Sequence, residues 1–150
     1  MTITQDNFSQ YAGIGYHGQI NTDYPSWASS QNAEGGAIGF GVAVSHGTAD
    51  TQAVKGGASS AVLIGVTVRT QSVENTLDGV SEYAEDRTMS VLEKGRMYVV
   101  VSDGATRGEA VYVVPATGEI VSTVGTNVAL TGARFVRSAA AGEVSEIEIK

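Results

Sequence analysis

The sequence predicts an all-β protein: a small antiparallel β-barrel or sandwich of about eight short strands, preceded by an extended N-terminal arm. Short apolar, β-branched runs recur along the chain from Ala37 onward. Glycine, at 19 of 150 residues, separates these runs. No long segment carries apolar residues at helical spacing, so helix has little support. At 150 residues the chain is the size of one domain.

The first expected strands are residues 37–45 and 61–70, because both runs alternate with a period of two. The apolar residues that share a face are Phe40, Val42 and Val44 in the first run and Val62, Ile64, Val66 and Val68 in the second. Between residues 73 and 84 a helix is conceivable, but Gly79 interrupts it. Because acidic residues dominate residues 74–86, we expect a solvated acidic loop there.

The second half of the chain predicts two hairpins and a final pair of strands. Residues 87–93 and 96–102 flank Lys94-Gly95, a two-residue turn signal. Residues 110–114 and 119–123 flank a turn that begins at Pro115 and ends at Gly118. Strands at 133–138 and 143–150 complete the set.

Residues 1–33 differ from the rest, so we divide the chain into an arm, 1–33, and a body, 34–150. The arm lacks apolar periodicity and is rich in polar residues and glycine. Yet it holds half of the ten aromatic residues: Phe8, Tyr11, Tyr16, Tyr24 and Trp27. Because such rings are enriched where two surfaces meet, we expect them to contact a neighbouring protein. Packing on the arm's own domain is the alternative. The body has enough Val and Ile for its own core, so we expect the arm to be dispensable for folding.

Composition excludes several function classes. With no cysteine, the chain has no disulfide, thiolate metal site or cysteine nucleophile. The formal charge is −7, and the first basic residue is Lys55, so no basic arm exists to bind nucleic acid. The first residues lack the features of a signal peptide, and apolar runs are too short for a membrane span, so we expect no membrane partner.

The motifs that suggest chemistry lack the context that the chemistry needs. Residues 13–18 match the GxGxxG spacing, but no strand precedes them and no helix is expected after them. Ser45 and His46 are adjacent on an expected strand, so they point to opposite faces and cannot form a catalytic pair with Asp50. His17 and His46 are the only histidines and lack metal-ligand spacing. We therefore expect no enzyme activity, no metal and no cofactor.

Several strings resemble the structural cement (head decoration) proteins of tailed bacteriophages. In chain order they are residues 34–41 (EGGAIGFG), 44–50 (VSHGTAD), 64–69 (IGVTVR), 91–95 (VLEKG), 108–118 (GEAVYVVPATG) and 127–135 (NVALTGARF). The resemblance runs collinearly from about residue 33 to the C-terminus. In the last string the family commonly has a proline and a tryptophan where this chain has Thr131 and Phe135.

The resemblance implies a non-enzymatic virion protein, made in the host cytoplasm, on the outer surface of the mature phage head. It implies binding at capsomer junctions and stabilisation of the capsid against internal DNA pressure. The implied partners are the major capsid protein and further copies of the chain, as a homotrimer. A carbohydrate-binding or adhesion module on a virion or cell surface is the alternative, because exposed Tyr and Trp rings can stack on sugars.

Overall fold

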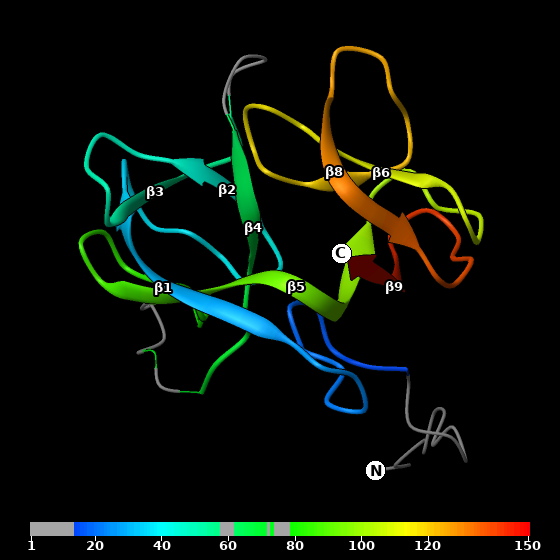
Figure 1. Ribbon diagram of the computed structural model, residues 1–150, viewed down its shortest axis with the longest axis horizontal. Coiled ribbons are helices and arrows are strands. Elements are labelled where there is room, and N and C mark those ends of the chain that lie inside the picture. The colour runs from blue at the N-terminus through cyan, green and yellow to red at the C-terminus, as the bar shows by residue number, and fades with distance from the viewer. Residues whose placement is uncertain (1–13, 58–61, 72, 74–78) are drawn as a thin grey trace, which may run out of the picture.

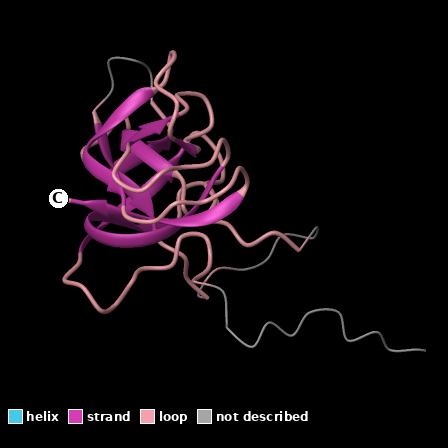
Figure 2. Cartoon of the chain, turned by 90° about the vertical axis from the view of Figure 1, so that its right-hand side faces the viewer, coloured by secondary structure: helices cyan, strands magenta, loops and turns pink. Residues whose placement is uncertain are grey.

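The computed structural model describes residues 14–57, 62–71, 73 and 79–150, and these contain nine strands and no helix (Figures 1 and 2). The strands are β1 (Trp27–Glu34), β2 (Ala43–His46), β3 (Gln52–Lys55), β4 (Leu63–Thr67), β5 (Thr88–Val101), β6 (Ala110–Val113), β7 (Ile120–Val121), β8 (Val128–Phe135) and β9 (Glu143–Ile149). The predicted all-β class is confirmed.

The strands form two groups that share β5 (Figure 1). In the first group the order β1-β3-β2-β4-β5 closes into a five-stranded barrel, because β5 also pairs with β1. In the second, β7, β6, β8 and β9 follow β5, and β9 pairs with β5 in turn. The expected antiparallel pairing holds for most of the sheet, but β1–β3 and β5–β7 are parallel, so the sheet is mixed.

Strand β5 belongs to both groups because its two halves have different partners. Its first half pairs with β1 and β4, and residues Gly95–Val101 pair with β9. Val91 and Leu92 are both fully buried, although adjacent strand residues point to opposite faces. This is possible because Val91 packs into one hydrophobic cluster and Leu92 into the other.

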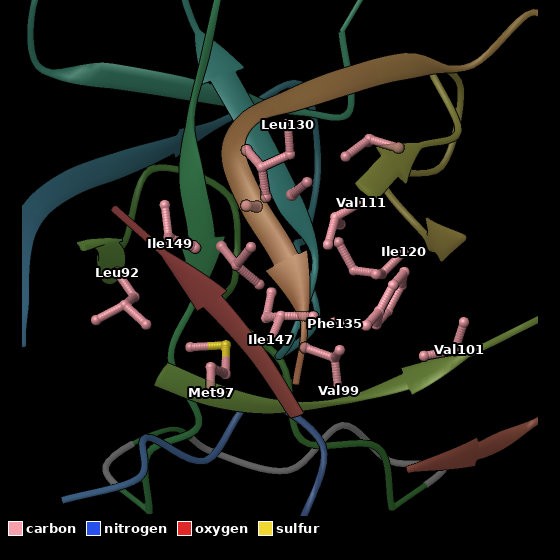
Figure 3. Close-up of a cluster of buried hydrophobic side chains, with 14 residues drawn as sticks. Leu92, Met97, Val99, Val101, Val111, Ile120, Leu130, Phe135, Ile147 and Ile149 are labelled. Atoms are coloured by element: carbon pink, nitrogen blue, oxygen red, sulfur yellow. The ribbon is translucent and has the colours of Figure 1, made fainter. Parts of the chain in front are cut away.

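The two hydrophobic clusters follow the same division. The smaller cluster, called the first cluster below, lies within the five-stranded barrel formed by the first group of strands, called the first barrel. Its buried members include Ile38, Phe40, Val44, Tyr83 and Met89. The larger one draws mainly on β5 to β9, where side chains from several strands converge on Phe135 (Figure 3). Its labelled members are Leu92, Met97, Val99, Val101, Val111, Ile120, Leu130, Phe135, Ile147 and Ile149.

The hairpin predicted at Lys94-Gly95 is wrong, because β5 runs through both residues as one strand of 14 residues. A bulge interrupts the β1–β5 register here: Trp27 pairs with Lys94, whereas Ala28 pairs with Leu92. Gly95 has a φ of 127°, and a Cβ on it would lie 3.1 Å from the carbonyl oxygen of Pro25. Glycine is therefore needed for a bend within a strand and not for a turn between two strands.

Other predicted strands are confirmed with shifted ends. The run at 37–45 contributes only β2, the run at 61–70 contributes β4, and β8 begins at Val128, before the expected start. The hairpin around Pro115–Gly118 joins β6 to β7 as expected, with the Gly118 N–H donating to the Val114 carbonyl. Of the expected acidic loop, residues 72 and 74–78 lie outside the described residues, and residues 79–84 are not helical.

Strands β1 and β3 were not predicted. β1 lies mostly within the segment expected to be an arm, yet it pairs with β5 along one edge and with β3 along the other. Its Ala33 side chain is fully buried in the first cluster. Residues 27–33 are therefore a barrel strand and not part of an extended arm, while the expectation that residues 1–33 are dispensable for folding stays a prediction.

Candidate interaction surface

Residues 17–21 continue along β5 beyond the end of β1. The N–H of Gly18 donates to the Tyr98 carbonyl, the N–H of Tyr98 donates to the Gln19 carbonyl, and the N–H of Asn21 donates to the Arg96 carbonyl. Ile20 forms an antiparallel bridge with Met97. Residues 17–21 and β1 therefore both run antiparallel to β5, along its edge from Thr88 to Tyr98, and residues 22–26 form a loop between them (Figure 1, blue).

Two glycines of the GxGxxG pattern, Gly15 and Gly18, allow this close packing, and Gly13 lies outside the described residues. A Cβ on Gly15 would overlap the ring of Tyr98. Gly18 has a φ of 82°, and a Cβ there would lie 2.8 Å from the backbone nitrogen of Gly41. Because Gly18 faces backbone atoms, no side-chain movement could make room. Gly15 and Gly18 thus have a packing role in this chain.

His17 fastens the same segment. Its Nδ1 accepts a hydrogen bond of 2.8 Å from the backbone N–H of Val100. Burial, and secondarily the positive charge of Arg69, lowers the pKa of His17. The neutral imidazole that can accept this hydrogen bond is therefore the favoured form in the folded protein.

The predicted contact residues that fall in the described part of the chain are exposed. Tyr16 is 70% exposed, Trp27 68% and Tyr24 42%, and Ile14, which the sequence did not single out, is 41% exposed. They lie at intervals along the segment that accompanies β5. Phe8 and Tyr11 lie outside the described residues.

Two of the rings are positioned by arginines. The guanidinium of Arg96 lies 3.7 Å from the centroid of the Tyr24 ring, and that of Arg69 lies 5.6 Å from the Tyr16 ring. Both are cation–π arrangements. They hold rings at the surface that would otherwise be free to change rotamer, which lowers the entropy cost of binding a partner.

Beside Tyr24 lies a charged row across β5, β9 and β8. Arg96 and Arg134 are both register partners of Glu148, which lies between them. Nε and Nη2 of Arg134 donate to Glu148 Oε2 at 3.2 and 3.0 Å, and Arg96 lies 3.7 Å from the same oxygen. The hydrogen bond from Arg134 is the main cause that lowers the pKa of Glu148.

The neighbouring carboxylate, Glu146, is only 2% exposed and carries more partners. Asn21 Nδ2 donates to its Oε1 at 2.8 Å, and Arg137 Nε donates to its Oε2 at 3.0 Å. Arg96 lies 3.9 Å from Oε1. A buried carboxylate needs such partners, so Asn21 joins the N-terminal segment to the sheet.

An open, polar depression of about 380 Å³ adjoins Glu146. Three arginines line it, Arg96, Arg107 and Arg137, together with Asp23 and Glu146 as the acidic members. Within the described residues, Arg107 is the one of these arginines with no carboxylate at ion-pair distance. Sequence reasoning missed this group, because its members are brought together by strand register.

Ser45 and His46, which the sequence analysis considered as a catalytic pair, lie on β2. Ser45 is buried and His46 is exposed, as expected for adjacent residues on opposite faces of β2. Among the described residues there is no group of three or more His, Asp or Glu that could hold a metal ion. Nor does any described segment form a helix with the length and apolarity of a membrane span.

Comparisons with known proteins give one family. The family model described as structural cement protein (E217 gp24/Pam3 gp6) matches residues 4–150. A chain from the capsid of Myoviridae phage XM1 superposes with a TM-score of 0.76 and 18% identity, covering 94% of this chain and 93% of the other. At this identity the likeness shows a shared fold.

A weaker likeness is to the N base of head fiber gp8.5 of bacteriophage phi29. The TM-score is 0.46 at 11% identity, over 84% of this chain and 95% of that one, which is too low to carry an argument. No curated protein matches the chain.

Proposed function

Because the chain belongs to the phage structural cement protein family (E217 gp24/Pam3 gp6), we propose that it binds the outer surface of the phage head at junctions between capsomers and stabilises the shell against the pressure of packaged DNA. Family membership makes it a structural component of the virion capsid and not an enzyme. Binding on the outside and the stabilising role are the proposal.

The exposed aromatic side chains along β5 support a binding role for the N-terminal segment. Tyr16, Tyr24 and Trp27 present large apolar area at the surface, on a segment fastened to the sheet by backbone hydrogen bonds. Tyr and Trp anchors contribute most of the binding energy in many interfaces. We propose that these rings, with Phe8 and Tyr11, contact the major capsid protein or a neighbouring copy of the chain.

A homotrimer around three-fold and pseudo-three-fold positions of the shell is the proposed arrangement. Small homo-oligomers are mostly closed and symmetric, and three copies around such a position would each meet an equivalent capsid surface. Isolated protein can still be monomeric if the capsid supplies part of the contact area.

The test is occupancy on purified capsids that lack the protein. Replacing Trp27→Ala or Tyr16→Ala should weaken binding by about 30-fold, since losing an aromatic anchor costs about 2 kcal/mol. The thermal midpoint should change little because both side chains are largely exposed. The matched control is Val124→Ala, an apolar residue 59% exposed in the loop before β8.

The outcomes are distinct. Normal occupancy by both aromatic variants would remove these rings from the contact surface. If wild-type protein itself fails to bind mature capsids, or if density for it lies inside the shell, the proposed function is wrong. Because the aromatic contact is apolar, moderate salt should only slightly weaken the binding of single copies to the capsid, measured at low occupancy.

A further inference from the structure

The lining of the depression carries three arginines against two carboxylates, Asp23 and Glu146, which leaves a formal excess of one positive charge. Glu146 is engaged by Asn21 and Arg137, and Glu148 by Arg134 and Arg96. Arg107, on the exposed loop between β5 and β6, has no carboxylate at ion-pair distance among the described residues. In a chain with a net charge of −7, an unneutralised arginine at the rim of a polar depression is a site for a carboxylate of another molecule.

The negative charges that complement these arginines lie on the turn before β5. Glu82, Glu85 and Asp86 come close together in sequence, and Glu85 and Asp86 are exposed. No ion pair joins any of the three to a cation of the described residues. The turn is held in place by the Asp86 N–H, which donates to the Ala33 carbonyl, so its carboxylates are presented from a fixed backbone.

Within one copy of the chain, the acidic turn and the arginine-lined depression are too far apart to contact each other. The turn precedes Thr88, the first residue of β5, and the arginine group begins at Arg96 in the second half of that strand. Extended strand rises about 3.3 Å per residue, so roughly 25–30 Å separates them. Two complementary surfaces at different positions on one molecule make a head-to-tail contact, which forms a closed ring when the rotation permits.

We propose that the depression lined by Arg107 and Arg137 receives the acidic turn, residues 82–86, of a second copy of this chain. The inference rests on one part of the proposed function, namely that copies of the chain lie next to one another on the capsid. It adds which surfaces of neighbouring copies are in contact. The planar guanidinium group of an arginine donates paired hydrogen bonds that match the two oxygens of a carboxylate. The contact therefore fixes the orientation of neighbouring copies. It is electrostatic, so it weakens with salt, unlike the aromatic contact to the capsid.

Charge reversal tests the contact. Arg107→Glu and Glu85→Arg should each weaken self-association, measured by sedimentation at low salt and by the cooperativity of capsid binding, by about tenfold or more. The double variant Arg107→Glu/Glu85→Arg should restore it. Arg107 and Glu85 are chosen because both are exposed and neither holds a buried partner. Lys55→Glu and Glu119→Arg make the same charge changes at exposed positions elsewhere and should leave association unchanged.

Cross-linking gives a second readout, because the chain has no cysteine of its own. The variant Thr106→Cys/Ala84→Cys, whose cysteines stand at exposed positions next to Arg107 and Glu85 and leave both charges in place, should give covalent oligomers larger than dimers when it is bound to capsids and treated with a short bis-maleimide. An equal mixture of the two single-cysteine variants should give no cross-linked product larger than a dimer. Absence of cross-linked product from capsid-bound double variant would overturn the proposal, whatever the association state in solution.

The outcomes separate this inference from the proposed function. If the single reversals lower capsid binding and the double variant does not restore it, the depression binds the capsid protein, and the inference is wrong while the function stands. Unchanged cooperativity of capsid binding in both single variants also overturns it. If wild-type protein does not bind capsids but reversal and rescue are seen in solution, the contact between copies stands and the proposed function fails.

Discussion

Strand β1 and residues 14–26 are consecutive in the chain and accompany the same strand, yet they are held in different ways. β1 pairs on both edges, with β5 and β3, and buries Ala33 completely. Residues 14–26 pair with β5 through a few hydrogen bonds, are joined to Arg69 by one at the Gly18 carbonyl and to Glu146 by one from Asn21, and expose Tyr16 and Tyr24. The difference shows that the region expected to be one arm contains two kinds of structure: both parts pair with β5, but only β1, from Asn32 onward, has a second paired edge.

The largest expected effect is a charge on the integral strand. Ala33→Asp places a carboxylate in the first cluster, so we expect a loss of stability of about 3 kcal/mol or more, or failure to fold. Ala28→Asp, on the same strand at an exposed position, should cost less than about 1 kcal/mol. Urea unfolding of both variants measures the difference.

Equal stability of these two variants would contradict the assignment of β1 to the barrel. In that case residues 27–34 would be fastened to the surface as residues 14–26 are, and the whole N-terminal region would be a dispensable arm after all.

An intermediate effect is expected at the glycine that brings the fastened segment close to the body. Gly18→Ala introduces both a strained φ and a Cβ 2.8 Å from the Gly41 nitrogen. Gly142 has nearly the same φ, 79°, but a Cβ on it would meet nothing within 4 Å, so Gly142→Ala reports the backbone strain alone. We expect about 1 kcal/mol for Gly142→Ala and about 1–3 kcal/mol more for Gly18→Ala, measured by urea unfolding.

Hydrogen exchange should show where the Gly18→Ala effect lies. Protection should fall at the amides of Gly18, Asn21 and Tyr98, which pair the segment with β5, and remain at β1. Loss of protection throughout the first barrel would mean that residues 14–26 and β1 form one cooperative unit and are not held in different ways.

The smallest expected effect is the contribution of His17 to the pH dependence of the protein's stability. The pKa of His17 is lowered in the folded protein, so the unfolded state binds a proton at higher pH than the folded state. The stability that neutral His17 contributes is therefore present above the unfolded pKa of about 6.5 and is lost as the pH falls toward the folded pKa. His17→Gln should flatten part of the decline in thermal midpoint between pH 7 and pH 5, because the amide oxygen can accept from Val100 without titrating. His46→Gln, at an exposed position, is the control, and an equal flattening there would remove His17 as the cause.

Much of the second group of strands could be predicted, because its signals are local. The β6–β7 hairpin follows from alternation on both sides of a turn that begins with Pro115 and ends with Gly118, whose φ is 74°. A proline at the start and a glycine with positive φ at the end specify such a turn within a few residues.

The predicted contact residues had a local signal too. Aromatic side chains without apolar periodicity suggested surface exposure, and Tyr16, Tyr24 and Trp27 are exposed. Their contact with a partner stays a prediction. The arginine group had no such signal, since Arg96 lies on β5, Arg107 in the β5–β6 loop and Arg137 after β8. They meet through contacts between segments distant in sequence, such as those of Arg137 with Glu146 and of the Arg107 N–H with Ser138.

The sequence by itself therefore determined the all-β class, the β6–β7 hairpin and the resemblance to the cement family. Only the tertiary structure decided that Lys94-Gly95 continues a strand and that Trp27–Glu34 is one. The physical reason is that both depend on partners distant in sequence. Gly95 permits a turn or a bend, and the pairing of β5 with β1 and β9 selects the bend. β1 buries a single side chain completely, and its place in the barrel comes from backbone hydrogen bonds, which leave no pattern in the sequence.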